Sequence, residues 1–140
     1  MALKSYRDLD VWKKSVDLVE AVYRLTDTYP DRERFGLSSQ SQRAAVSIAA
    51  NIAEGYGRSH RGDYLRHLSI ASGSLAELET HLVIAARLNY TTRQAAKPLW
   101  LLSQDVGKML VKLTKSLNTD APRRNPEPGT RNPGPDGQEN

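Results

Sequence analysis

Cationic and aromatic residues that could bind a polyanion cluster near the middle of the chain. They are Tyr56, Arg58, His60, Arg61 and Arg66. Cationic side chains contact backbone phosphates, and aromatic rings stack on unpaired bases. The cluster therefore predicts a surface that binds RNA or DNA. A solvated loop, in which the arginines pair with Asp63 and neighbouring acids, is an equally good interpretation of the same residues.

A polar stripe precedes this cluster at helical spacing. Steps of three and four residues place on one helix face Gln40, Arg43, Ser47, Asn51 and Glu54. We expect Arg43 to pair with Glu54 or with Glu77 of the following segment. Asn51 would bond to Ser74 or to a backbone carbonyl, because an orphan polar group between helices costs about 1–3 kcal/mol. The stripe, including Glu77, is predicted to be structural and to fix the register of two helices.

The sequence contains no arrangement typical of catalysis. It lacks cysteine, and phosphate-loop, zinc-protease and nucleophile-elbow motifs are absent. His60, His67 and His81 are separated by multiples of seven residues, so neighbours on one helix would lie about 10 Å or more apart, too far to share one ion. We interpret them as surface or rim histidines. The predicted protein is not an enzyme and has no catalytic residues, cofactor or bound metal.

Four helical segments must position these residues. The first has Asp8 or Asp10 as its cap and stops before Pro30. It carries two apolar stripes, one face made by Leu9, Trp12, Val16, Val19, Tyr23 and Thr26 and a second beside it made by Val11, Leu18, Val22 and Leu25, so we expect this helix to contact neighbours on two sides. The second stripe exceeds what one bundle requires and predicts self-association.

The other three segments also follow helical periodicity. The second would be capped by Ser38 and end at Gly55 or Gly57. The third ends near Asn89 and has the most regular pattern, with Tyr64, Leu68, Ala71, Leu75, Leu78, Leu82 and Ala85. The fourth has a core face of Leu99, Leu102, Val106, Met109, Leu113 and Leu117. Either it starts at Lys97, with Pro98 in its first turn, or it starts earlier and is kinked at Pro98.

Short connections between long helices favour an all-α fold, an antiparallel up-down-up-down four-helix bundle over residues 1–118. Residues 119–140 are rich in proline and glycine and lack large apolar side chains, so we expect a disordered tail. The chain carries a net charge of +4. Neither a signal peptide nor an apolar run long enough for a membrane span is present, so a cytoplasmic protein without membrane contact is expected.

Three stretches together resemble a known family. They are DLDVWKKSVDLVEAVYRLTDTYP, FGLSSQSQRAAVSIAANIAEGYGR and YLRHLSIASGSLAELETHLVIAARLNY. They are similar to the four-helix-bundle proteins encoded in intervening sequences of bacterial 23S ribosomal RNA genes. The resemblance runs from about Tyr6 to Leu117, leaves out the tail, and departs from the usual fourth helix at Pro98.

This resemblance implies a ring-shaped homopentamer without catalytic residues. It also implies a likeness in architecture to the accessory protein of diversity-generating retroelements, which binds nucleic acid and a reverse transcriptase. Our functional hypothesis is a non-enzymatic oligomer that binds RNA or DNA through the basic cluster. The alternative hypothesis is an adaptor ring that binds a protein partner, such as a reverse transcriptase, without touching nucleic acid.

Overall fold

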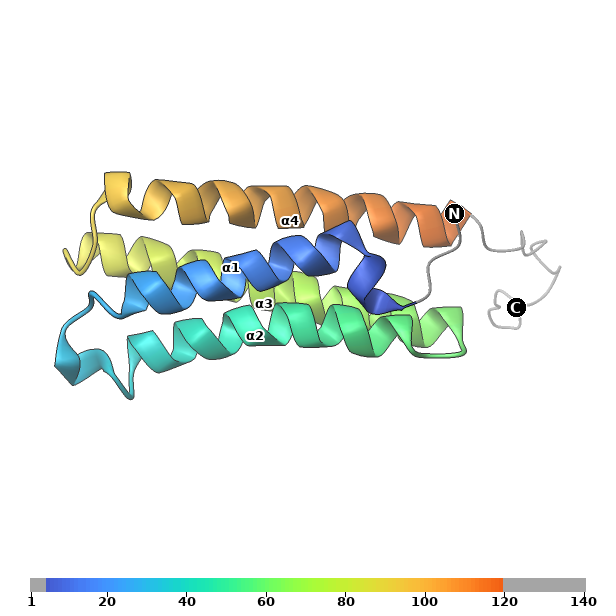
Figure 1. The fold of residues 1–140 in the computed structure, drawn as a ribbon, viewed down its shortest axis with the longest axis horizontal. Coiled ribbons are helices and arrows are strands. Elements are labelled where there is room, and N and C mark those ends of the chain that lie inside the picture. The colour runs from blue at the N-terminus through green and yellow to red at the C-terminus, as the bar shows by residue number, and fades with distance from the viewer. Residues whose placement is uncertain (1–4, 120–140) are drawn as a thin grey trace, which may run out of the picture.

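The computed structural model describes residues 5–119, which form helices joined by turns. The long helices are α1 (Asp10–Thr26), α2 (Leu37–Tyr56), α3 (Arg61–Arg87) and α4 (Arg93–Thr119), and two short 3-10 helices, η1 (Tyr6–Asp8) and η2 (Asp31–Glu33), precede α1 and α2. Successive long helices lie side by side and run in opposite directions (Figure 1). The predicted all-α four-helix bundle is confirmed. Of the predicted tail, residues 119–140, Thr119 is the last residue of α4, and residues 120–140 lie outside the described part of the chain.

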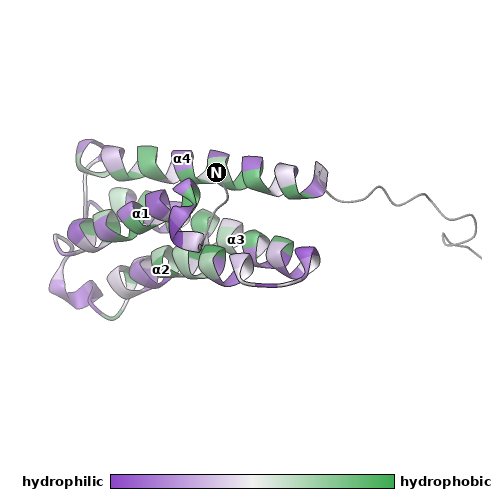
Figure 2. Ribbon diagram, turned by 45° about the vertical axis from the view of Figure 1, so that its right-hand side comes forward, coloured by the Kyte–Doolittle hydropathy of each residue, from purple (hydrophilic) through white to green (hydrophobic). Residues whose placement is uncertain are grey.

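Each long helix contacts the next one along the chain, and α1 also contacts α4, so the four helices enclose one core. Hydrophobic stripes alternate with polar ones along every helix (Figure 2). The largest fully buried apolar side chains come from all four helices and are Leu18, Val22, Ile48, Ile52, Leu68, Leu78, Val106 and Leu110. Burial of each such side chain stabilises the fold by about 1.5–3 kcal/mol.

Helix α1 shows which of its two apolar stripes is the core face. Val11, Leu18 and Val22 are buried, so the second of the two stripes is the core face. The other stripe lies on its flank, where Trp12 is only partly buried and Tyr23 is 48% exposed. The sequence did not distinguish the core face from the flank, because two adjacent apolar stripes on one helix look equivalent in sequence.

Helix starts differ from the predicted caps. Ser5 caps η1 through a reciprocal pair of hydrogen bonds with Asp8, and α1 begins after Leu9 without a side-chain cap. At α2 the expected cap, Ser38, is buried inside the helix. Glu33 performs this role instead, since its Oε1 accepts a hydrogen bond from the backbone N–H of Leu37 at 2.9 Å.

In the connection between α3 and α4, a backbone hydrogen bond closes the end of α3 and a threonine side chain caps the start of α4. Asn89 adopts a left-handed backbone conformation with φ of 62°, and the N–H of Tyr90 bonds back to the carbonyl of Ala85 at 2.9 Å. Thr92 then accepts a hydrogen bond from the N–H of Ala95 at 3.0 Å, and α4 begins at Arg93. Pro98 consequently lies inside α4, so a helix start at Lys97 was the wrong alternative.

Candidate functional site

Polar side chains connect α2 to α3 along the line where the two helices meet. The Ser74 hydroxyl donates a hydrogen bond to Ser47 Oγ at 2.8 Å. Asn51 Nδ2 donates to the same oxygen at 3.1 Å and to the Ser47 carbonyl at 2.9 Å. The predicted bond between Asn51 and a backbone carbonyl is therefore present, while Ser74 bonds to Ser47 rather than to Asn51.

His67 extends this network into the buried side of α3. Its Nδ1 lies 2.9 Å from Asn51 Oδ1 and 4.0 Å from Glu54 Oε1. Because Asn51 Nδ2 already donates to Ser47, Oδ1 is the acceptor, and His67 Nδ1 must carry a proton. His67 Nε2 is buried and has no hydrogen-bond partner within residues 5–119. The hydrogen bond to Asn51 is thus the one that holds the His67 ring, and it joins α3 to α2 in addition to the bond between Ser74 and Ser47.

Gly55 lets α2 and α3 approach closely beside this bond. A Cβ at position 55 would lie 2.8 Å from His67 Cβ and 3.0 Å from Tyr64 Cδ1. Ordinary carbon–carbon contacts require about 3.5–4.0 Å. Glycine is therefore required here for packing, whereas Gly57, the first residue after α2, has more room.

The outer part of the predicted polar stripe has a different environment. Gln40, Arg43, Glu54 and Glu77 are exposed. Arg43 has no ion pair with any residue in the described part of the chain, and Glu54 pairs with Arg58 at 3.6 Å. The predicted Arg43–Glu54 pair was wrong, because residues 43 and 54 are about 16 Å apart along one helix. The alternative Arg43–Glu77 pair does not form either.

The predicted nucleic-acid-binding residues come together at the turn between α2 and α3. Arg58, His60, Arg61 and Arg66 are all exposed. Arg58 shares Glu54, whereas Arg61 and Arg66 form no ion pair with another residue of the region 5–119. Gly62 has open space where a side chain would be. The predicted ion pairs between these arginines and Asp63 are therefore absent, and the guanidinium groups of Arg61 and Arg66 face solvent.

Two tyrosines form the aromatic part of this cluster. The rings of Tyr56 and Tyr64 meet edge to face, with centroids 6.1 Å apart. Burial, and to a lesser extent the neighbouring Tyr56, raises the pKa of the Tyr64 hydroxyl. Tyr56 is only partly buried. It lies beside the cations in the sequence, and its ring is in contact with that of Tyr64.

The histidines differ from their predicted surface placement. His60 is exposed, but His67 and His81 are 5% and 8% exposed, so both are buried. The signal available in the sequence was their spacing, which places both beside the leucines of α3. His81 Nε2 lies 3.9 Å from Glu77, and its Nδ1 has no hydrogen-bond partner among residues 5–119. Within that range no group of three or more potential metal ligands occurs.

One surface feature was not singled out from the sequence. A groove between α3 and α4 exposes Val83, Trp100 and Val111. In sequence these residues are ordinary members of apolar helices. Their exposure depends on how far apart the two helices lie, which periodicity does not report.

The protein is a four-helix bundle in which polar side chains join α2 to α3 and basic residues gather at the turn between them. Its described part contains no metal-binding cluster. The sequence model of the 23S rRNA-intervening sequence protein family matches residues 7–112, and the chain belongs to this family. No described helix is long and apolar enough to cross a membrane.

A solved structure supports this assignment. It is the crystal structure of a protein of unknown function from the S23 ribosomal protein family of Bacteroides thetaiotaomicron. The two chains are 28% identical, with a TM-score of 0.70 over 75% of this chain and 98% of the other. A search of curated proteins finds no match.

Proposed function

We propose that this protein is a non-enzymatic, cytoplasmic, oligomeric bundle that binds RNA or DNA at the turn between α2 and α3. The observation that carries this proposal is the exposed group of Arg58, Arg61 and Arg66, of which two lack an ion-pair partner in the described chain. Unpaired guanidinium groups can contact phosphates without first losing an internal partner.

The N-terminal end of α3 adds to the positive potential of this turn. His60 precedes the helix and provides no side-chain cap, so the first backbone N–H groups of α3 remain available to an anion. Asp63 in the first turn opposes part of this effect. The side-chain cations therefore supply most of the expected binding energy, and the helix terminus supports them.

Substitution of all three arginines tests the proposal. The Arg58→Gln, Arg61→Gln, Arg66→Gln variant should bind a mixed-sequence oligonucleotide more weakly and with a flatter dependence on salt. The slope of log K against log salt should fall by about one for each lost phosphate contact. A control variant removes three exposed cations on α1 and α2 by changing Lys13, Arg24 and Arg43 to glutamine. Equal losses in the two variants, or no binding by the wild type at low salt, would contradict the proposed site.

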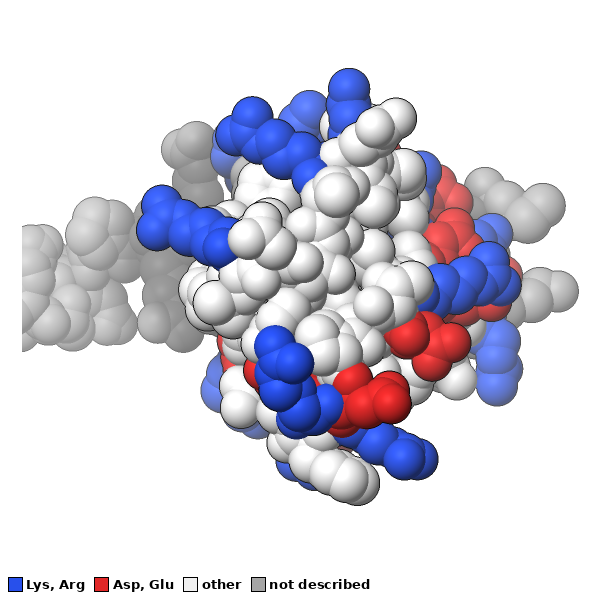
Figure 3. Space-filling view, turned by 90° about the vertical axis from the view of Figure 1, so that its left-hand side faces the viewer, with Lys and Arg blue, Asp and Glu red and all other residues white. Residues whose placement is uncertain are grey.

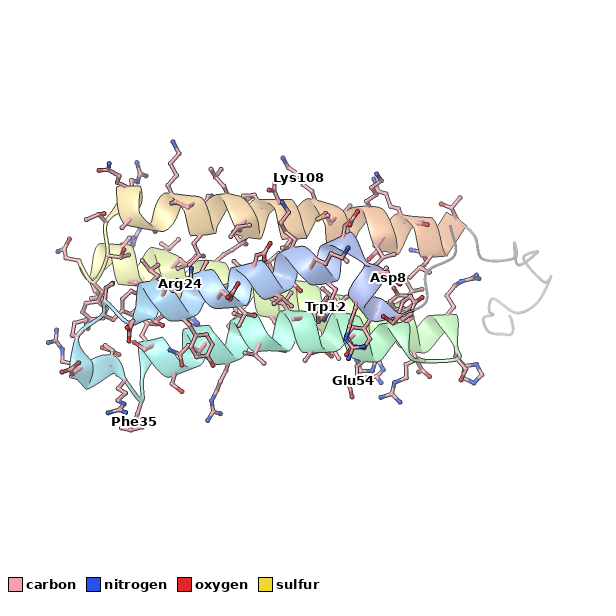
Figure 4. The ribbon with its side chains drawn as sticks, viewed as in Figure 1. Asp8, Trp12, Arg24, Phe35, Glu54 and Lys108 are labelled. Atoms are coloured by element: carbon pink, nitrogen blue, oxygen red, sulfur yellow. The ribbon has the colours of Figure 1, made fainter. Side chains whose placement is uncertain are left out.

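We also propose that the bundle self-associates through the outer face of α1 and α2. Trp12, Val16 and Val19 are partly buried on α1, and Tyr23 is 48% exposed there. Val46 of α2, 43% exposed, lies one turn after Gln42, whose side chain bonds to Thr26 of α1, so it belongs to the same face. Figure 4 shows Trp12 at the front of the bundle. The family resemblance implies five copies.

Sedimentation measures this self-association directly. The wild type should sediment as a homopentamer, and Val46→Glu should shift it toward the 15.6 kDa monomer. Ile70→Glu is the matched control, because Ile70 is an equally exposed apolar residue, at 41%, on α3. A wild-type monomer at micromolar concentration would refute the proposal, and so would equal effects of the two substitutions.

A further inference from the structure

A groove extends along the surface between α3 and α4. It consists of two hollows of about 670 Å³ and 430 Å³ that follow one another along the same pair of helices. The first lies between residues 82–87 of α3 and 93–100 of α4, and the second between residues 75–79 and 103–111. The side of the groove on α4 spans residues 93–111, which corresponds to about 27 Å of helix.

Large apolar side chains line this groove and remain partly exposed. Val83 is 46% exposed, Trp100 37% and Val111 55%. Small residues keep the groove open, since Ala86 and Ala96 line the first hollow and Gly107 the second. A Cβ on Gly107 would lie 3.3 Å from Leu75 Cδ2, so the helices are already close beneath it. An apolar groove of this length is typical of a surface that packs against another helix.

The edges of the groove are basic. Its charged lining residues are Arg87, Arg93, Lys97 and Lys108, with a single carboxylate from Glu79. That carboxylate already accepts a hydrogen bond from Gln104 at 2.9 Å. Residues 80–104 contain no aspartate or glutamate. The α4 edge therefore carries three cations, Arg93, Lys97 and Lys108, while the α3 edge carries Arg87 at one end and Glu79 at the other, so the lining of the apolar floor has an excess of positive charge.

The excess charge of the long helices belongs to α4. Equal numbers of acidic and basic side chains occur in α1, in α2 and in α3. In α4 a single acid, Asp105, faces five basic residues, a net charge of +4, and they are Arg93, Lys97, Lys108, Lys112 and Lys115. Figure 3 views one end of the bundle and shows the red side chains mainly at the right and bottom, away from α4. Lys108 projects from α4 on the side opposite Glu54 (Figure 4).

We propose that this groove binds an amphipathic helix of another protein, whose apolar face is flanked by aspartate or glutamate. The apolar floor matches the apolar face, and the four cations match the flanking carboxylates. A second copy of this chain does not offer that complement, because none of its long helices has an excess of acid. The tail, residues 120–140, lacks large apolar side chains. The inference is independent of nucleic-acid binding at the α2–α3 turn.

Two synthetic peptides test the groove with the full chain. Each has eighteen residues (about 27 Å of helix) with leucines spaced three and four apart, flanked by glutamate in one peptide and by lysine in the other. Fluorescence anisotropy should show the glutamate peptide binding at least about tenfold tighter, a difference of about 1.4 kcal/mol. Val83→Glu should weaken its binding at least about tenfold by the same conversion. Ile70→Glu should not weaken it, and both variants are first checked for unchanged helical circular dichroism.

If Val83→Glu does not fold, Lys97→Gln provides the second variant, because its side chain is exposed. Lys97→Gln should weaken binding of the glutamate peptide and leave the affinity for the lysine peptide unchanged. Equal affinity of the two peptides, or binding unaffected by Val83→Glu or Lys97→Gln, would overturn the proposal. Conversion of the oligomer to monomers by Val83→Glu would show that a second copy covers the groove. Displacement of the peptide by an oligonucleotide would assign the groove to nucleic acid, and either result would also overturn the proposal.

Discussion

Replacement of Gly55 by alanine tests how closely α2 and α3 must approach. The new Cβ would lie 2.8 Å from His67 Cβ, 3.0 Å from Tyr64 Cδ1 and 3.3 Å from the Tyr64 carbonyl oxygen. Two of these atoms belong to or adjoin the α3 backbone, so the helices must separate, which also stretches the bond between His67 and Asn51. Overpacking of this kind costs about 1–3 kcal/mol of unfolding free energy.

Gly73 provides the matched control for this prediction. It lies inside α3, and a Cβ there would meet no atom within 4 Å. Gly73→Ala should therefore stabilise the fold by about 0.5–1 kcal/mol through helix propensity alone. Gly55→Ala has the same propensity gain, so the difference between the two variants isolates the overpacking term of about 1–3 kcal/mol.

Denaturation followed by circular dichroism measures this difference. For a domain of this size 1 kcal/mol shifts the melting temperature by about 4 °C. All variants should be compared at one protomer concentration, because association contributes to apparent stability. If Gly55→Ala proves as stable as Gly73→Ala, the close approach of α2 and α3 is not required, and the reasoning fails.

Three further predictions follow from the polar contacts. Asn51→Ala removes the hydrogen-bond acceptor of buried His67 Nδ1 and should lower the unfolding free energy by about 1–3 kcal/mol, measured by urea titration. Burial raises the pKa of Tyr29 to about 12; wild-type stability should therefore fall as pH rises above 10, a loss that Tyr29→Phe should lack in alkaline melts. The pKa of Glu33 is lowered by the N–H at the start of α2 and by Tyr90; stability should therefore fall as pH drops below 4.5, and acid titration of Glu33→Gln should show less of this loss.

The third helix shows what sequence periodicity can predict. Its expected core residues from Leu68 to Ala85 are all buried, and Tyr64 packs against them. This works because a single regular apolar stripe leaves one face available for the core. The same reasoning could not choose the core face of α1, where two neighbouring stripes are both apolar. Only packing against the other helices distinguishes them.

Polar contacts between helices were harder to predict than the helices themselves. The sequence indicated that Ser47 and Asn51 belong to a polar stripe, but it did not identify His67 as their partner. A helical wheel gives the direction of each side chain without its depth or its height relative to the neighbouring helix. For the same reason Arg43 was assigned a partner that lies too far along the same helix, and Glu33 was missed as the cap of α2.

The confinement of excess charge to α4 gives the bundle an electric dipole across its width. Three neutral helices lie on one side and a helix of charge +4 on the other. Near any polyanion the molecule should rotate so that α4 faces the polyanion, before a specific contact is made. In a closed assembly mutual repulsion favours keeping the α4 edges of neighbouring copies apart. Within about one Debye length, 8 Å at physiological salt, this repulsion helps to decide which face of the bundle is turned outward.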